Sequence, residues 1–413
     1  MPVAAFQGVR VRGMDETSAF MLLKALANLS ENHPSNRTSL VDAGGLGVLL
    51  ALMRHNASSP SVQSEALIAL ANLSSNDHTS NQTRIVQAGA IKPILAAMRY
   101  HKTNASVQEY ACSALWTLAC DHAANKSHIV DEGGVALVLS AMRAHETSED
   151  VQGHACAVLW SLSARHAENQ SRIGGEGGLA QVLSAMRAHG TSVDVQGHAC
   201  LALFSLSCNH AENKSRIVGK GGLALVLSAM RAHETSADVQ GHACWALLSL
   251  SVNHAENKSR IVDEGGLALV LSAMRAHEAN ARVQEYACAT LSSLGAYHAE
   301  NQSRIGDAGG VAQVLSAMRA HETSAGVQEH ACSALWSLSS NHAENQSRVV
   351  DEGGVAQVLS AMRAHETSAG VLEYACATLS SFRLNDDERA RMDEAVLVAD
   401  GFRTSADARQ CEN

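Results

Sequence analysis

The feature that most constrains the fold of this chain is a tandem repeat of 44 residues. The string SAMRAH begins at Ser140 and recurs at each step of 44 residues as far as Ser360. Valine marks a second register with the same step, from Val107 to Val371, and a more diverged copy begins at Val62. A period of this length is typical of architectures in which each unit buries its apolar side only against its neighbours. We therefore expect one elongated stack of similar units.

Each unit divides into three helical segments. In one copy, apolar residues fall at helical spacing over residues 107–119, a short amphipathic segment covers 122–132, and a third apolar segment covers 135–145. The pair Gly133-Gly134 separates the last two, since glycine ends helices and permits a sharp turn. Aromatic residues make up only 3% of the chain, and no proline follows Pro93. This composition favours helices over strands.

The pattern predicts an all-α solenoid with about nine copies of the long helix. We expect the solenoid to cover residues 18–395 as a single body. Residues 1–17 are expected to form a cap or a flexible segment, and residues 396–413 a C-terminal tail.

Three segments of the chain resemble the armadillo repeat family. VQEYACSALWTLA and ALANLSSN are similar to its third helix, and ENKSRIVDEGGLALVLSAM is similar to its first and second helices. The resemblance extends over roughly residues 18–395 and includes the Gly-Gly corner. It implies a right-handed superhelix whose third helices line a concave groove, and a role in binding extended peptides or partner proteins.

One feature of the peptide-binding members is mostly absent. In nuclear transport adaptors an Asn on the third helix, with a Trp four residues earlier, holds the main chain of the peptide. Here that Asn occurs only as Asn28 and Asn72, and the later copies carry Thr117 or a serine, as at Ser161. The resemblance therefore implies gripping Asn residues only at these two positions, and a nuclear transport adaptor is the less favoured function.

The differences between copies cluster on the third helix. Counted from the Thr/Ser position of each copy, the residues one, four, seven and eight places earlier fall on the side opposite the apolar stripe. Large rings and imidazoles gather there, which predicts an exposed patch for a partner. The alternative is that each ring packs on the third helix of the next unit. The predicted groove residues are Tyr110, Trp116, His154, Trp160, His198, Phe204, His242, Trp245, Leu248, Tyr286, His330 and Trp336. In this interpretation the rings anchor the partner, and Ser, Thr and His side chains supply hydrogen bonds.

Cysteine recurs once in each unit, in one register from Cys112 to Cys376. Neighbours in a helix stack lie about 8 to 10 Å apart, which is too far for a disulfide, so we expect reduced packing residues. His154 and Cys156 do not predict a metal site, because residues two apart on a helix point in different directions. The histidines that end each SAMRAH string are expected to meet carbonyl groups at helix C-termini.

No catalytic constellation, cofactor motif or metal-ligand spacing stands out, so the sequence predicts a protein that is not an enzyme and binds no cofactor. The net charge of -10 argues against nucleic acid as a partner. Neither a run of apolar residues long enough to span a membrane nor a secretory signal is visible. We expect an intracellular monomer, cytoplasmic or nuclear.

The predicted function is that of a scaffold or adaptor that binds an extended segment or a helix of a partner protein in its groove. The alternative is a regulatory or targeting subunit of a larger complex that uses its convex face or its ends.

Overall fold

A computed structural model of the chain describes residues 13–31, 33–75 and 79–382. Within these residues every regular element is a helix, and the helices follow one another in repeating sets of three. The longest of each set is the third helix, which has 15 residues in most copies. The third helices are α1 (Glu16–Ser30), α4 (Pro60–Ser74), α7 (Ala105–Ala119), α10 (Glu149–Ser163), α13 (Val193–Ser207), α16 (Ala237–Ser251), α19 (Ala281–Gly295), α22 (Ala325–Ser339) and α25 (Ala369–Ser380).

Two shorter helices lie between successive third helices. The first helices are α2 (Pro34–Asp42), α5 (Thr79–Gln87), α8 (Ala123–Asp131), α11 (Ala167–Gly175), α14 (Ala211–Gly219), α17 (Ala255–Asp263), α20 (Ala299–Asp307) and α23 (Ala343–Asp351). The second helices are α3 (Gly45–His55), α6 (Ile91–Tyr100), α9 (Gly134–Ala144), α12 (Gly178–Ala188), α15 (Gly222–Ala232), α18 (Gly266–Ala276), α21 (Gly310–Ala320) and α24 (Gly354–Ala364).

The ends of these helices follow from particular residues. Ser148 precedes α10, and its hydroxyl accepts a hydrogen bond from the Val151 amide, which satisfies one of the free N–H groups of the first turn. His166 caps α11 in the same way, because its Nδ1 accepts from the Asn169 amide. The imidazole is therefore a helix cap in this register of the repeat.

The Gly-Gly corner needs both of its glycines, for different reasons. Gly177 has a φ of 93°, in the left-handed region that only glycine enters without strain. Gly178 has no such backbone requirement, but a Cβ there would lie 2.8 Å from the Ile173 carbonyl oxygen. The first glycine makes the turn between α11 and α12, and the second lets the two helices approach each other closely.

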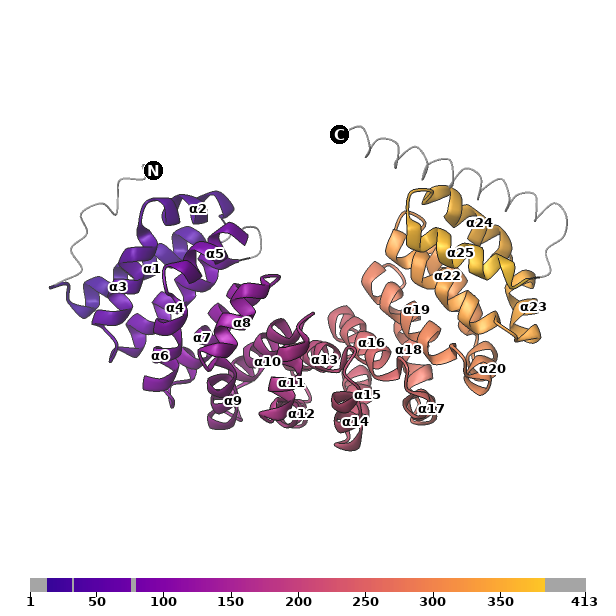
Figure 1. Cartoon of the computed structure of the whole chain (residues 1–413), viewed down its shortest axis with the longest axis horizontal. Helices are drawn as coiled ribbons and strands as arrows, with labels where there is room; N and C mark the ends of the chain where they lie inside the picture. Colours follow the sequence, from indigo (N-terminus) through magenta and orange to yellow (C-terminus); the bar gives the residue numbers. More distant parts are fainter. Residues whose placement is uncertain (1–12, 32, 76–78, 383–413) are drawn as a thin grey trace. The chain divides into compact units, whose positions relative to one another are not determined.

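The helices form two compact units, which divide between Lys220 and Gly221. In the first unit α1, α4, α7, α10 and α13 pack one against the next (Figure 1). In the second unit α16, α19, α22 and α25 do the same (Figure 1). The core of each unit consists of the small and medium apolar residues of these helices, such as Val158 and Leu159 in α10, which have no exposed surface.

Histidine side chains at the C-termini of the second helices connect successive repeats. The Nε2 of His145, at the C-terminus of α9, lies 2.9 Å from the carbonyl oxygen of Lys102 in the preceding repeat. His189, His277, His321 and His365 make the same contact with the loop carbonyl one repeat earlier. These histidines were expected to meet carbonyl groups at helix C-termini. The carbonyls they contact belong to the neighbouring repeat, so their role is to hold repeats in register.

The predicted fold class, an all-α armadillo-type solenoid of three-helix repeats, is confirmed. Helix α1 begins at Glu16, two residues before the expected start of the repeats. Residues 383–395 of the expected solenoid and the tail 396–413 lie outside the described residues, as do residues 1–12. The single body over residues 18–395 stays a prediction. None of the helices in the described part of the chain is long and apolar enough to cross a membrane.

Candidate functional site

The residues predicted for the groove all lie on the third helices, and every one of them is partly exposed. The leucine two places before the reference position, Leu159 in α10, has no exposed surface, and the same holds for its equivalents in the other late copies. The rings and imidazoles at the predicted positions thus keep some surface open, while the leucine stripe beside them is buried. We call the side formed by the positions eight, seven, four and one before the reference the third-helix face; its small residues, such as Gly153 and Ala157, are buried.

The rings on this face also contact one another across repeats. Trp245 of α16 stacks on Tyr286 of α19, with the ring centroids 4.5 Å apart and the planes at 11°. Trp336 of α22 and Tyr374 of α25 lie 6.2 Å apart in a tilted arrangement. For Trp245 and Trp336 both interpretations thus describe part of the surroundings, since each of these rings packs sideways on the next third helix and keeps some surface open.

The Trp116 ring contacts residues of the two third helices that follow its own. Its ring lies 6.4 Å from that of His154 on α10 and 5.5 Å from that of His198 on α13, two repeats away. The intervening helix carries small residues on this face, Gly153 and Ala157, both buried. Because these side chains are small, the indole can extend across α10 to the following helix. An aromatic cluster therefore joins three consecutive third helices of the first unit.

Carboxylates lie on the same face, at the position eight before the reference. Glu285 contacts the next repeat, where its Oε1 is 3.9 Å from Nε2 of His330. Burial raises the pKa of Glu109, and the nearby Asp150 adds to this shift. The sequence analysis placed this position on the exposed side but did not single out its residues. The signal was present, because Glu109, Glu285, Glu329 and Glu373 occupy one register of the repeat.

Most of the reference hydroxyls are buried between third helices. The expectation that Ser, Thr and His side chains supply hydrogen bonds to a partner stays a prediction. Ser205 has only 1% of its surface exposed, and its hydroxyl lies 2.6 Å from that of Ser163 in the preceding third helix. Ser293 and Ser251 form a similar pair at 2.8 Å, and Thr117 bonds to Ser74. A short side chain at this position lies between adjacent third helices, where its hydroxyl forms a hydrogen bond with a hydroxyl of the neighbouring helix.

The two Asn residues that resemble the family's gripping residues have different surroundings. Asn28 in α1 is exposed. Asn72 in α4 is partly exposed, and its Nδ2 donates a hydrogen bond of 3.1 Å to the Ala27 carbonyl of the preceding third helix. The amide of Asn72 is thus already engaged between repeats.

The recurring cysteines lie beneath this face. Cys112, Cys156, Cys244 and Cys332 have no exposed surface, and burial raises the pKa of each thiol to about 12. A thiol with so high a pKa is neither a nucleophile nor a metal ligand near neutral pH. Among the residues that the structure describes, no three His, Cys, Asp or Glu side chains are grouped so that they could hold a metal ion.

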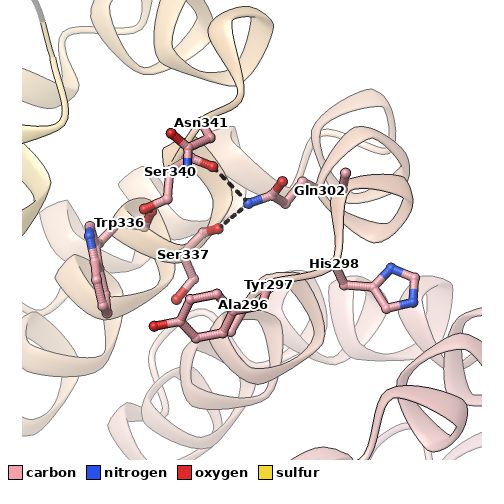
Figure 2. A pocket seen from close by; sticks show the side chains of 9 residues that line it. Ala296, Tyr297, His298, Gln302, Trp336, Ser337, Ser340 and Asn341 are labelled. Carbon is pink, nitrogen blue, oxygen red and sulfur yellow. Dashed lines mark hydrogen bonds between the residues drawn. The ribbon is translucent and has the colours of Figure 1, made fainter.

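A pocket of about 260 Å³ opens where the C-terminal ends of α19 and α22 meet. Its walls include the rings of Tyr297 and Trp336 (Figure 2). To one side of these rings, the Gln302 side chain donates hydrogen bonds to the carbonyls of Ser337 and Ser340, at 2.7 and 3.2 Å (Figure 2). The pocket joins one predicted residue, Trp336, to one that the sequence analysis did not single out, Tyr297.

Known proteins resemble the chain in both sequence pattern and structure. A family model described as LRRK2 ARM repeat matches residues 47–222 and 267–404. An engineered protein is similar in structure, with a TM-score of 0.69, 26% sequence identity and coverage of 89% of each chain. No curated protein matches the sequence.

Two further solved structures share the fold. One concerns a phosphorylation switch that controls the interaction between cadherin and β-catenin, and it has a TM-score of 0.64 and 19% identity over 91% of this chain and 73% of that chain. The other is a designed armadillo repeat protein in complex with the peptide (KR)4, with a TM-score of 0.50 and 19% identity over 58% of this chain and 96% of that chain.

Proposed function

Because the chain belongs to the armadillo repeat family, we propose that it is a non-enzymatic scaffold that binds a segment of a partner protein on its third-helix face. The observation that carries this proposal is the set of rings at the variable positions. Trp116, Trp160 and Trp336 are partly exposed, whereas the leucines beside them are fully buried. Aromatic side chains that combine a large apolar area with open surface are the usual anchors of protein interfaces.

The structures of similar proteins support binding of protein segments in general. The designed armadillo repeat protein is in complex with a peptide, and the β-catenin structure concerns an interaction with cadherin. At 19% identity these likenesses do not identify a ligand for this chain. The net charge of -10 favours a protein partner over nucleic acid. An intracellular location and a monomeric state stay predictions from the sequence.

Gripping of a peptide main chain by a ladder of Asn residues is not part of the proposal. The amide of Asn72 is bonded to Ala27, and most of the later copies place buried hydroxyls at the equivalent positions. We propose instead that side-chain contacts with the rings dominate the interaction, and that the partner lies across several repeats as an extended segment or a helix.

Replacing three rings tests this proposal. The variant with Trp116→Ala, Trp160→Ala and Trp336→Ala is expected to lose at least ten-fold in affinity for a partner that wild type retains, because truncation of a central aromatic anchor typically costs about 2 kcal/mol or more. The measurement is affinity capture of partners by wild type, followed by titration of the retained protein against wild type and the variant.

A control variant carries three large side chains on the second helices and none on the third helices. Ala136, Ala180 and Ala356 are exposed, and changing all three to Arg leaves the third-helix face intact. Retained binding by this control, with binding lost in the Trp variant, supports the proposal. The opposite pattern supports the alternative, in which another face of the solenoid makes the contacts. Far-UV circular dichroism of both variants verifies that each is folded.

A further inference from the structure

The arginines of the first helices are paired with carboxylates in most repeats. In α11, Nη1 of Arg172 lies 3.5 Å from Oδ1 of Asp131, one repeat earlier, and its Nε lies 3.0 Å from Oε1 of Glu176, one turn later. In α17, Arg260 pairs with Glu264 one turn later in the same way. The pair between repeats recurs as Arg84–Asp42, Arg304–Asp263 and Arg348–Asp307. Each of these arginines is therefore neutralised by at least one acidic residue.

The same register of α14 lacks both kinds of acidic partner. Gly175 stands at the position of the aspartate one repeat earlier, so Nη2 of Arg216 donates a hydrogen bond of 2.8 Å to the Gly174 carbonyl instead. Lys220 stands at the position of the glutamate, so a second cation follows Arg216 one turn later. The ion pair that Arg216 keeps is with Glu212, whose Oε1 is 3.7 Å from its Nη1 and whose side chain is 72% exposed.

A third cation lies beside Lys220. Near the end of α12, Nη2 of Arg187 donates a hydrogen bond of 2.9 Å to the Lys220 carbonyl. The equivalent arginines of three other repeats make the same contact with the carbonyl of a glutamate, in the pairs Arg99–Glu132, Arg231–Glu264 and Arg319–Glu352. We call Arg187, Arg216 and Lys220 the basic cluster. All three residues belong to the first unit, in a chain whose net charge is -10.

The basic cluster is open to solvent. Arg187 and Lys220 are exposed, and Arg216 is partly exposed. A Cβ added at Gly175 or at Gly219 would have no atom within 4 Å, so the space beside both glycines is empty. Three other repeats carry the string VDEGG where residues 218–222 read VGKGG. Because like charges one turn apart on a helix repel each other, the exchange costs stability unless an anion from outside binds there.

We propose that the basic cluster binds a phosphorylated serine or threonine side chain of a partner protein. A phosphate monoester carries about two negative charges near neutral pH and three acceptor oxygens, which suits two guanidinium groups and one ammonium group. Carboxylates limit the cluster on both sides, since Glu176 holds the equivalent position one repeat earlier and Glu212 precedes Arg216 by one turn. A compact anion is therefore favoured over a nucleic acid or an anionic membrane.

The basic cluster is separate from the third-helix face. Its residues lie on α12, on α14 and directly after α14, and none of them is on a third helix. The two sites can therefore be tested independently. The variant with Trp116→Ala, Trp160→Ala and Trp336→Ala is expected to bind phosphoserine as wild type does.

The test uses the full-length protein and N-acetyl-phosphoserine methylamide as the probe. Binding is followed near neutral pH and at low salt by the amide NMR signal of Gly219, assigned with Gly219→Ala. The phosphoserine derivative is expected to shift this signal saturably, and the serine derivative is expected to leave it in place. The aspartate derivative carries a single charge and is expected to bind about ten-fold more weakly.

Two substitutions taken from sister repeats test the residues. Lys220→Glu gives Arg216 the helical partner that Arg172 has, so it is expected to keep or raise the thermal unfolding midpoint while weakening phosphoserine binding about ten-fold. Gly175→Asp restores the aspartate one repeat earlier and is expected to weaken binding about five-fold. Lys102→Glu makes the same change of charge at an exposed position of the first unit and is expected to leave binding unchanged.

Several results would overturn the proposal. They are unchanged phosphoserine binding in Lys220→Glu, equal weakening in Lys102→Glu, and equal binding of the aspartate and phosphoserine derivatives. Sedimentation with phosphatidylserine vesicles and titration with a single-stranded oligonucleotide test the other anions. Binding of wild type to either one that is lost in Lys220→Glu would assign the cluster to a membrane or to nucleic acid instead.

Discussion

Raising the pH from 8 to 11 is expected to unfold the protein, because thiols buried in its core resist ionisation. An ordinary cysteine has a pKa near 9.0, and burial in the folded chain raises the pKa of Cys112, Cys156, Cys244 and Cys332 to about 12. The pKa of Cys288 is raised in the same direction by burial and by the neighbouring thiols. Below pH 9 both states hold the proton, so the stability is fully present. Between pH 9 and 12 only the unfolded chain releases it, and stability is lost.

The expected loss of folding stability at high pH is large. At two pH units above the unfolded pKa, each such thiol costs about 3 kcal/mol, so five of them cost on the order of 10 kcal/mol, which matches the stability of a whole domain. Burial lowers the pKa values of Lys126, Lys214 and Lys258, and this acts in the opposite direction. The pKa shifts of the five thiols are larger, so the thiols dominate.

The contribution of the thiols is measured by comparison. Urea unfolding at several pH values, in the presence of a reductant, gives the slope of the free energy of unfolding against pH. In the variant with Cys156→Ala and Cys288→Ala, the slope between pH 10 and 11 is expected to be less negative than that of wild type by about 1.4 kcal/mol per pH unit for each thiol removed. Equal slopes in the two proteins would show that the buried cysteines are not the cause.

Neighbouring residues of α10 are expected to respond in opposite ways to truncation. Leu159 is fully buried in the first unit, so Leu159→Ala should cost about 2 to 5 kcal/mol of stability through lost burial and the cavity left behind. Trp160 is partly exposed on the third-helix face, so Trp160→Ala should cost clearly less stability and should weaken partner binding. Urea midpoints of the two variants, compared with wild type, provide the measurement.

This comparison tests the orientation of the third helix. If Trp160→Ala destabilises the protein as much as Leu159→Ala does, the Trp160 ring is a core residue and not an anchor for a partner. A destabilised Leu159→Ala variant that still binds the partner at low temperature would confirm that the two positions have separate roles.

The fold could be predicted from the sequence because the same helical spacing of apolar residues and the same glycine breaks recur in successive repeats. The helical spacing of apolar residues over 107–119 appears as α7, and the Gly133-Gly134 pair separates α8 from α9. The side-chain contacts between repeats could not be predicted, because the sequence of one unit does not show which residue of the neighbouring unit a given side chain contacts. His145 reaches the carbonyl of Lys102 in this way, where a contact with a helix C-terminus was expected.

In the candidate site, too, features within one helix could be predicted, whereas contacts between repeats could not. Helical phase placed Trp116 on the correct side of α7, but it could not show that small residues on α10 let this ring approach His198. The buried position of Ser205 was also beyond reach, since a hydroxyl suits a groove and an inter-helix bond equally well. Tyr297 was missed although its signal is in the sequence. It is the aromatic residue in a register of positive φ that otherwise holds Asn, Asp and Arg.

Site-specific crosslinking tests most directly whether a partner lies on the third-helix face. The photoreactive residue p-benzoylphenylalanine is placed at Trp160 in one protein and at Ala180, an exposed position on α12, in the other. We expect irradiation of the complex to join the partner to position 160 and not to position 180. Crosslinking at position 180 with none at position 160 would contradict binding on the third helices.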